Sequence, residues 1–327
     1  MTSGSSFVRL NGLDAVPAAL RGGVVAIGNF DGCHLGHQRV FDAARKRARA
    51  NGAPLLALTF EPHPRDVFAP EPFMYRLTDA DAKAALFAAL GFDGLVVMPF
   101  SRDLAGVEAT DFVGRYLIDA LGVAGVAVGA DFHFGKGRAG TPDFLRAQGS
   151  AHGFGVDVLE MLDDGTAAIS SSRIREALSE GEVETANGLL GYRHFLTGTV
   201  VEGDRRGRTL GYPTANVPLP ANCRLAQGVY AVRVRLGDAV HSGVAAYGKP
   251  MFDNSAPPFE TFIFDFDRDI YGQHLEIALL AHLRGQMRFD GLDALVAQMG
   301  WDAERARAII AEAVPLSPLD GALGFVG

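Results

Sequence analysis

The chain has 327 residues, of which 48% are hydrophobic and 21% are charged, and its formal net charge at pH 7 is -8. This composition is typical of a globular protein with room for two ordinary domains, and the negative charge excludes a basic field that would attract nucleic acid or an anionic membrane. The two cysteines, Cys33 and Cys223, give no disulfide framework, and without a signal-like N-terminus or a run of about eighteen apolar residues the sequence predicts a cytoplasmic protein.

The first half of the chain alternates short apolar runs with amphipathic stretches. The predicted strands are Val24–Ile27, Leu55–Phe60, Leu95–Phe100, Val126–Gly129 and Val156–Met161. The predicted helices, in which apolar residues recur at helical spacing, are Gln38–Ala50, Asp79–Leu90, Thr110–Leu121 and Asp143–His152. This alternation predicts a doubly wound parallel α/β sheet, which binds ligands at the carboxyl ends of its strands.

The stretch between the first strand and the first helix, residues 28–37, reads GNFDGCHLGH. Its glycines let backbone amides approach a ligand, and the start of a helix adds partial positive charge. His34 and His37 can each donate a hydrogen bond to a phosphate oxygen. The stretch therefore predicts a nucleotide-phosphate site. The other residues that we assign to this site are Gly28, Asn29, Phe30, Asp31 and Gly36.

Two other interpretations of this stretch stay open. Asp31, His34 and His37 could ligate a metal ion, although a lone cluster of three ligands is weak support for a metal site. The histidines could also serve only as caps of the helix that follows.

Two later loops at predicted strand ends carry further candidates. The second strand runs into Glu-Pro-His-Pro-Arg, where two prolines predict an extended path that presents Arg65 either to a phosphate or to solvent. The fourth strand runs into a loop that contains Asp131, Phe132 and Phe134 among glycines and cations. That composition suits a planar ligand that bears phosphate.

The run ISSSRIREAL then opens another helix. A single serine is enough to cap a helix, so three serines followed by an arginine exceed what a cap needs. Ser171, Ser172 and Arg175 predict a second anion site at a helix N-terminus.

From Gly181 onward the pattern changes. Glu182–Gly191 reads as a helical connector, and runs with a period of two follow it. The predicted strands are Thr197–Val201, Gly228–Leu236, Ala239–Tyr247, Phe259–Phe266 and His274–Leu283, and the terminal helix is Leu292–Ala313. The pattern predicts an antiparallel barrel or sandwich. We place the domain boundary near Tyr192, which gives domains of residues 1–191 and 192–327.

The densest stretch of the second half reads GDRRGRTLGYPTAN. The candidates for wrapping a polyphosphate are Gly203, Arg206, Gly207 and Arg208. An arginine-rich hairpin on a solvated face is the alternative. Pro213 sets the backbone so that Thr214 and Asn216 project to one side, where a hydroxyl and an amide oxygen could complete the coordination of Mg²⁺ held by a triphosphate.

A carboxylate stands among aromatic residues in Phe259–Phe266. With a period of two, Glu260 shares a face with Phe262, Phe264 and Phe266. A carboxylate on an aromatic face is costly unless it has a partner, so Glu260 is a candidate base for phosphoryl transfer. If the faces of the strand are assigned wrongly, Glu260 belongs to an ordinary edge strand.

Six motifs together resemble those of the bacterial bifunctional riboflavin kinase/FAD synthetases. They are GNFDGCHLGH, TFEPHPR, VGADFHFGKGRAG, ISSSRIREAL, GDRRGRTLGYPTAN and DFDRDIYG, and they follow the family's order between about Val24 and Ala313. The resemblance implies an N-terminal FMN adenylyltransferase of the HxGH nucleotidyltransferase type and a C-terminal riboflavin kinase on a six-stranded barrel with a terminal helix. Riboflavin and ATP would give FMN and ADP, and FMN and ATP would give FAD and pyrophosphate, with Mg²⁺ as cofactor.

In the adenylyltransferase half, the resemblance implies a role for each motif. The phosphates of ATP would be held by His34 and His37, and its β- and γ-phosphates by Ser171, Ser172 and Arg175. Asp131 would lie beside the nucleotide and the flavin. The residues on the flavin side would be Arg65, Phe132 and Phe134.

In the kinase half, Thr214 and Asn216 match residues that bind Mg-ATP, and Glu260 matches the base that activates the 5′-hydroxyl of riboflavin. The sequence departs from the family's pattern on the flavin side of this half, at Ala246, Met251 and Phe262. These departures keep open a second interpretation, in which the chain is an FAD synthetase only and the barrel is a scaffold or a flavin-sensing module.

Overall fold

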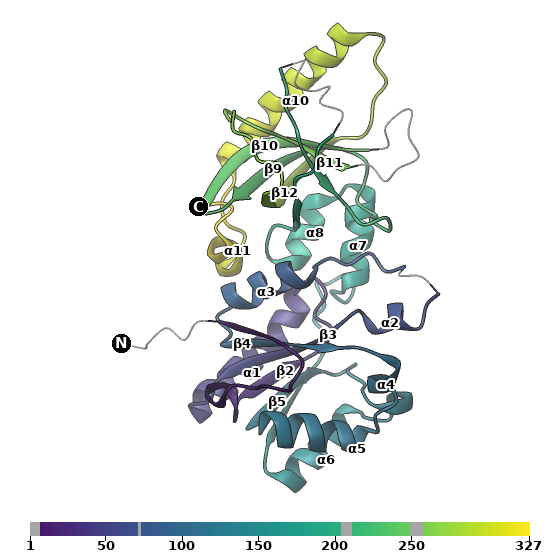
Figure 1. The fold of residues 1–327 in the computed structure, drawn as a ribbon, viewed down its shortest axis with the longest axis vertical. Helices are drawn as coiled ribbons and strands as arrows, with labels where there is room; N and C mark the ends of the chain where they lie inside the picture. The colour runs from purple at the N-terminus through teal and green to yellow at the C-terminus, as the bar shows by residue number, and fades with distance from the viewer. Residues whose placement is uncertain (1–6, 71–72, 204–210, 249–257) are drawn as a thin grey trace. The chain divides into compact units, whose positions relative to one another are not determined.

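The computed structural model describes residues 7–70, 73–203, 211–248 and 258–327. By its contacts the chain divides into two compact units, one of Met1–Met74 with Lys83–Ser170 and one of Tyr75–Ala82 with Ser171–Gly327. A parallel α/β sheet forms the core of the first unit and an antiparallel barrel with a long helix forms the core of the second, which confirms the predicted fold class (Figure 1). The boundary that we place near Tyr192 stays a prediction.

The first unit is built on a parallel sheet with the strand order β1-β4-β3-β2-β5-β6. The strands are β1 (Val8–Asn11), β2 (Val24–Ile27), β3 (Leu55–Glu61), β4 (Gly94–Pro99), β5 (Gly125–Gly129) and β6 (Gly155–Leu159). The four central strands are almost continuously apolar and buried, as expected of strands that are covered on both faces. From β2 the chain builds the sheet outward through β3 and β4, and then returns to add β5 on the other side. The topological switch point of the sheet therefore lies between β2 and β5.

Helices cover both faces of this sheet (Figure 1). They are α1 (Leu35–Asn51), α2 (Pro64–Val67), α3 (Ala80–Ala89), α4 (Arg102–Ala105), α5 (Ala109–Asp111) and α6 (Pro142–His152), with the short helices η1 (Ala18–Leu20) and η3 (Lys136–Arg138) and the π-helical segment η2 (Phe112–Leu121). α1 buries Val40, Phe41, Ala44 and Ala48, the positions that its spacing predicts. β1 was not predicted, because a four-residue edge strand that is only half buried gives little sequence signal.

The second unit contains an antiparallel sheet with the order β7-β12-β9-β10-β11-β8. The strands are β7 (Phe195–Thr199), β8 (Ala215–Pro218), β9 (Gly228–Leu236), β10 (Ala239–Tyr247), β11 (Pro258–Ile263) and β12 (His274–Arg284). The two outer strands approach each other through a bridge between Val201 and Asn216, in which the amide of Val201 donates to the carbonyl of Asn216 at 2.9 Å. The sheet is therefore a nearly closed barrel rather than a sandwich.

The helices of the second unit are α7 (Ser171–Glu180), α8 (Val183–Leu190), α10 (Leu292–Glu312) and α11 (Pro318–Leu323). α10 packs on β9 and β10 (Figure 1), where Ala306 joins a cluster with Ala231, Phe264, Leu280 and Leu283. We expected α10 to close the chain, and this was wrong because α11 follows it. In the described ranges, no helix combines the length and the apolar character needed to cross a bilayer.

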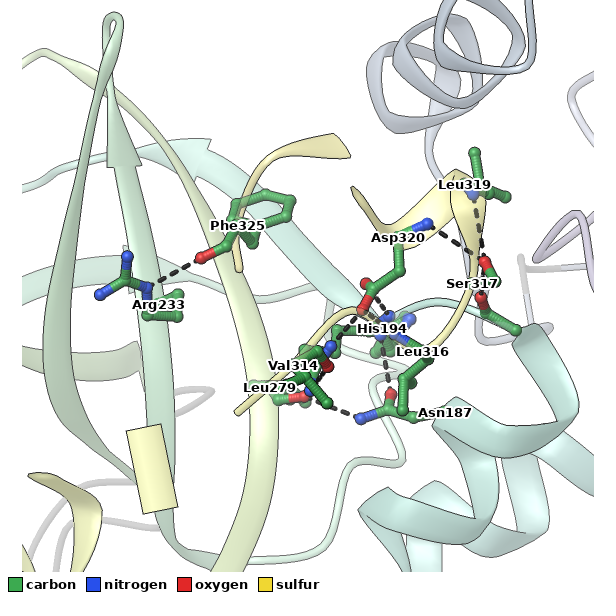
Figure 2. Close-up of polar contacts among 12 residues, drawn as sticks. Asn187, His194, Arg233, Leu279, Val314, Leu316, Ser317, Leu319, Asp320 and Phe325 are labelled. Atoms are coloured by element: carbon green, nitrogen blue, oxygen red, sulfur yellow. Dashed lines mark hydrogen bonds and ion pairs between the residues drawn. The ribbon is translucent and has the colours of Figure 1, made fainter. Parts of the chain in front are cut away.

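The segment after α10 folds back against the barrel (Figure 2). Asp320 is fully buried, forms an ion pair with Arg193, and accepts hydrogen bonds from the amides of Arg193 and Leu316 at 2.9 Å each. The carbonyl of Phe325 accepts from Nε of Arg233 at 2.8 Å, while its fully buried ring packs 5.4 Å from that of Phe195. The last residues of the chain thus complete the core of the second unit.

Candidate active sites

The loop after β2 is held in an unusual backbone conformation. Phe30 and Cys33 have φ values of 47° and 40°, which residues with a side chain rarely adopt. The ring of Phe30 is buried in the core against Phe41 and Phe87, at 4.8 and 5.8 Å. A Cβ atom at Gly28 would come within 2.8 Å of this ring, so glycine is required there. The loop is thus fixed by core packing in a shape that suits a bound anion.

His34 is the N-cap of α1. Its Nδ1 accepts a hydrogen bond from the amide of His37 at 3.3 Å, as the capping interpretation expects. In a neutral imidazole the proton then lies on Nε2, which becomes a donor. Capping therefore uses one nitrogen of His34 and leaves the other with the proton that a phosphate oxygen requires.

His37 stacks on His34, with ring centroids 3.7 Å apart and planes at 17°. Burial lowers the pKa of His37 well below its ordinary value, and the nearby charges of His34 and Lys83 lower it further. His37 is therefore neutral at pH 7 and can offer one N–H group. Its Nδ1 is buried and has no hydrogen-bond partner among the described residues.

The metal interpretation of this stretch finds no support in its geometry. Asp31 is buried, with 3% of its surface exposed. Nowhere in the described part of the chain do three His, Cys, Asp or Glu side chains gather as a metal ion would need, and this includes Asp31 with His34 and His37.

The loop after β5 lies at the same carboxyl edge as the loop after β2, because the two strands are parallel neighbours. Asp131 is exposed in this loop, and Phe132 is half buried. Phe134 is buried in the core of the first unit, where its ring stacks 5.5 Å from that of Phe132. Phe134 therefore supports Phe132 from the core, and the assignment of both rings to a flavin site stays a prediction.

Arg65 lies in a short helix rather than in the extended path that we expected. Pro64 occupies the first position of α2, where its fixed φ favours a helix, and buried His63 caps it by accepting from the amide of Arg65 at 3.2 Å. Arg65 is exposed, and its guanidinium makes no hydrogen bond or ion pair within the described ranges. Its side chain is therefore available for an anion.

Ser171, Ser172 and Arg175 belong to the second unit, where they open α7 as expected. Nε of Arg175 donates to the carbonyl of Tyr75 at 2.6 Å, so part of its guanidinium already serves a structural contact. Binding of phosphate by these three residues stays a prediction.

A pocket of about 280 Å³ lies at the seam of the barrel, beside β8 and β11 and the loop that follows β11. Thr214, Asn216 and Thr261 line it, and Oδ1 of Asn216 and Oγ1 of Thr261 are buried without a hydrogen-bond partner among the described residues. Gly203 lies directly against Asn216, since a Cβ atom there would lie 2.0 Å from the Asn216 amide nitrogen and would displace that side chain. Buried oxygen atoms without a hydrogen-bond partner can coordinate a cation that prefers oxygen ligands, such as Mg²⁺.

The sequence analysis missed Thr261, since only the pairing of β11 with β8 brings it to this pocket. Three other candidates, Arg206, Gly207 and Arg208, lie outside the described residues, as does Met251.

Glu260 is in register with Asn216 on one side and Ala246 on the other, so these side chains share a face of the sheet. Glu260 is exposed, so the argument that its carboxylate is buried on an aromatic face was wrong. Phe262 does lie on this face, with its ring 5.0 Å from that of Tyr212. The role of Glu260 as a base therefore depends on the resemblance and on its position beside Asn216.

The sequence analysis also missed Lys83, which is fully buried beneath the loop after β2. A signal was present, because Lys83 shares its helical spacing with buried Phe87 and so falls on the apolar face of α3. A charged residue at such a position needs partners, and those of Lys83 are Glu61, Asn29 and Thr59.

Comparisons with known proteins cover both units. Residues 16–173 match a family model described as FAD synthetase, and residues 190–310 match one described as riboflavin kinase. A protein of Escherichia coli K12 named bifunctional riboflavin kinase/FMN adenylyltransferase is 37% identical over 292 residues, covering 89% of this chain and 93% of the relative. Proteins of the same name from Listeria monocytogenes and Bacillus subtilis are each 38% identical over 293 residues, covering 88% and 86% of this chain and 93% and 91% of the relatives.

A solved structure from Streptococcus pneumoniae, described as a macrolide-efflux protein, has a TM-score of 0.80 and 32% sequence identity. The alignment covers 92% of this chain and 98% of the other. Likeness along nearly the whole length, together with matches to both family models, shows that this chain belongs to the family of bifunctional riboflavin kinase/FMN adenylyltransferases.

Proposed function

We propose that the chain makes FAD from riboflavin in two ATP-dependent steps. The barrel transfers the γ-phosphoryl group of ATP to riboflavin and releases FMN and ADP. The α/β unit then transfers the adenylyl group of a second ATP to FMN and releases FAD and pyrophosphate. ATP is a substrate in both steps, and FMN is the product of the first step and a substrate of the second.

The observation that carries the adenylyl-transfer step is the stacked pair of His34 and His37 at the N-terminus of α1. Charge builds up on the phosphate oxygens as the bond to pyrophosphate breaks. Donors that are already fixed in place stabilise this charge without reorganisation. Nε2–H of His34, the N–H of neutral His37 and the first amides of α1 are donors of this kind. The edge at the switch point between β2 and β5 is where a doubly wound sheet binds a nucleotide.

For the kinase step we propose that Thr214 and Asn216 hold Mg-ATP and that Glu260 takes the proton from the 5′-hydroxyl of riboflavin. Support for the Mg²⁺ site comes from the buried Oδ1 of Asn216, which lacks a hydrogen-bond partner among the described residues. Mg²⁺ would neutralise charge on the phosphates when bound. Glu260 stands opposite Asn216 in the β8–β11 ladder, within the same part of the barrel.

The remaining assignments follow the same proposal. Ser171, Ser172 and Arg175 would bind the outer phosphates of ATP, while Arg65, Asp131, Phe132 and Phe134 would form the part of the site beside the nucleotide and the flavin. We also propose the cytoplasm as the place of action, in line with two cysteines that are both free thiols.

The test is product analysis with the purified full chain. Riboflavin with ATP and Mg²⁺ should give FMN that is converted to FAD, and FMN with ATP should give FAD and pyrophosphate. Omission of Mg²⁺ should abolish FMN formation. Conversion of FMN to FAD without any conversion of riboflavin would instead favour an FAD synthetase with a scaffold barrel. Binding of flavin without either product would favour a sensing module.

A further inference from the structure

A lysine lies buried directly beneath the loop that carries the histidine pair. Lys83 is 0% exposed, and its ammonium group has three hydrogen bonds. Nζ donates to Oε1 of Glu61 at 2.7 Å, to the carbonyl of Asn29 at 3.1 Å and to Oγ1 of Thr59 at 3.3 Å. The three acceptors match the three donors of an ammonium group, and Glu61 supplies the opposite charge.

The hydrogen atoms of this cluster have a fixed direction. Oγ1 of Thr59 donates to the same carbonyl of Asn29, at 3.0 Å. Because an ammonium group can only donate and a carbonyl oxygen can only accept, Oγ1 of Thr59 accepts from Lys83 and gives its one hydrogen to Asn29. The carbonyl of Asn29 therefore receives two hydrogen bonds, one from the ammonium and one relayed through the threonine.

Asn29 is the residue at which the backbone enters the strained part of the loop. Phe30 follows it at φ 47°, and the loop leads through Cys33 at φ 40° to the N-cap His34. A second set of contacts fixes the far end, where Nε2 of Gln38 donates to the carbonyl of Cys33 at 2.9 Å. The backbone between the two fixed ends positions both histidines.

We propose that Lys83, acting through Thr59 and the carbonyl of Asn29, is a positioning residue for adenylyl transfer. This inference rests on the proposed function of the same site and adds to it a residue that contacts no substrate. Burying an ammonium group costs free energy that its partners must offset, so an apolar residue would meet the packing needs of α3 at a lower free-energy cost. The positive charge of Lys83 also reaches His37, whose pKa it helps to lower. Lys83 thereby helps to keep that imidazole a neutral donor.

The pair Thr59→Val and Thr59→Ser gives the sharpest test. Valine keeps the shape of threonine and removes the relay, whereas serine keeps the hydroxyl and loses a methyl group. We expect Thr59→Val to lower kcat for FAD formation from FMN by about 10- to 100-fold, as slight misplacement of catalytic groups does, with KM for ATP and FMN little changed. Thr59→Ser should keep kcat near that of the unchanged chain. If Thr59 served only packing, kcat would fall equally in the two variants, or it would fall more in Thr59→Ser than in Thr59→Val.

Lys83→Met tests the ammonium directly, and Lys46→Met is its matched control. Lys46 is exposed on α1, so the same chemical change there removes a charge without breaking the cluster. We expect Lys83→Met to lower kcat for FAD formation, per folded molecule, by about 10- to 100-fold and Lys46→Met to leave it unchanged. FMN formation by the barrel should be the same in both variants.

The outcomes separate the inference from the function on which it rests. If the unchanged chain makes no FAD from FMN, the proposed function fails. If it makes FAD and Thr59→Val matches Thr59→Ser in kcat, the positioning role of Lys83 is wrong. A rise in KM at constant kcat would also overturn it, because it would mean that the cluster supports ground-state binding. Should Lys83→Met fail to fold, the two Thr59 variants decide.

Discussion

The two histidines of the HxGH motif take different parts in the cap of α1, and this gives each a distinct sensitivity to substitution. His34 caps the helix with its side chain and is also a proposed donor, so its replacement should change both stability and catalysis. His37 contributes its backbone amide to the cap, and its ring takes no part in capping. A change at His37 therefore reports on catalysis more cleanly than a change at His34.

His37→Ala should lower the turnover of FAD formation by about 10²- to 10³-fold, as the loss of one preorganised donor commonly does. FMN formation should be unchanged, because Glu260, Thr214 and Asn216 lie in the other unit. Steady-state rates with supplied FMN and with riboflavin measure the two effects. Near-normal FAD formation by a folded His37→Ala protein would remove His37 from the mechanism.

His37 should also make stability depend on pH. Its pKa in the folded chain lies well below the ordinary value of 6.5, so between the two values the unfolded chain binds a proton that the folded chain does not. The stability is therefore full above pH 6.5 and is lost as pH falls from there toward the folded pKa, by at most about 1.4 kcal/mol per pH unit.

Denaturant unfolding of the unchanged chain and of His37→Gln, compared at neutral and mildly acidic pH, measures this contribution. On acidification the unchanged chain should lose more free energy of unfolding than the variant. His282, whose pKa is also lowered by burial, is common to both proteins and cancels. Equal pH dependence in the two would show that His37 titrates normally.

Glu260→Gln keeps the size of the side chain and removes the base. FMN formation should fall by about 10²- to 10⁴-fold, the usual contribution of a positioned base, while FAD formation from FMN stays intact. The melting temperature should not change, because Glu260 is exposed. Glu312→Gln, at an exposed position near the end of α10, is the control. Kinase turnover within a few-fold of normal would mean that Glu260 is not the base.

At the scale of elements, the pocket proposed for Mg-ATP depends on a close approach between β8 and the chain after β7. The bridge from Val201 to Asn216 brings the outer strands of the sheet together, and Gly203 follows two residues later against the Asn216 side chain. Without a Cβ at position 203, the amide of Asn216 keeps its place in the pocket. One short strand thus both closes the barrel and presents a proposed ligand of Mg-ATP.

Gly203→Ala should displace the Asn216 side chain, because the new Cβ would lie 2.0 Å from its amide nitrogen. We expect weaker binding of Mg-ATP to the barrel and slower FMN formation, with FAD formation from FMN retained. Gly285→Ala is a matched control in the same unit, since no atom lies within 4 Å of its added Cβ. Titration calorimetry with Mg-ATP measures the affinity, and equal affinity in both variants would contradict the close-approach argument.

The sequence predicted an element well where the residues of that element alone show a clear pattern. The bounds of β9 and β10 agree with the structure, and burial alternates with a period of two over the second half of each strand. β8 lies next to a proline, has four residues and reads as a loop, so its pairing with β11 was not foreseen. Lys83 was not predicted either, because its proposed role depends on long-range contacts. Its partners are Asn29, Thr59 and Glu61, which come from distant parts of the chain. Local sequence patterns predicted the motifs. The residues that hold the motifs in place are brought together by contacts between distant parts of the chain, which a local pattern does not show.

At the scale of the whole molecule, each reaction is assigned to residues of a different unit, apart from the predicted phosphate ligands on α7. The predicted connector, which is α8 in the structure, belongs with α7 to the unit of the barrel by its contacts. The side chain of Asn187 in α8 donates to the carbonyl of Leu279 at 2.9 Å and accepts from the amide of His194 at 2.8 Å (Figure 2). Leu279 lies in β12 and His194 directly precedes β7, so Asn187 joins two parts of the barrel.

A fragment from Tyr192 to Gly327 should fold and bind Mg-ATP, but it should be less stable than a fragment from Ser171. The shorter fragment lacks Asn187 and leaves the buried groups of Leu279 and His194 without their partner, at about 1–3 kcal/mol for each group. Thermal unfolding of the two fragments measures the difference. Equal melting temperatures would show that α8 adds nothing to the barrel, and an insoluble shorter fragment would move the boundary toward Ser171.

The thiol of Cys33 gives the loop after β2 a built-in chemical reporter. It is 0% exposed, and it donates to the carbonyl of Phe30 at 3.4 Å. Burial raises its pKa to about 12, so at neutral pH it is protonated and unreactive toward alkylating reagents. Reagent reaches it only when the loop leaves its strained conformation. The rate at which Cys33 is alkylated is therefore a measure of how often the loop opens, and a nucleotide that binds the closed loop should slow that rate.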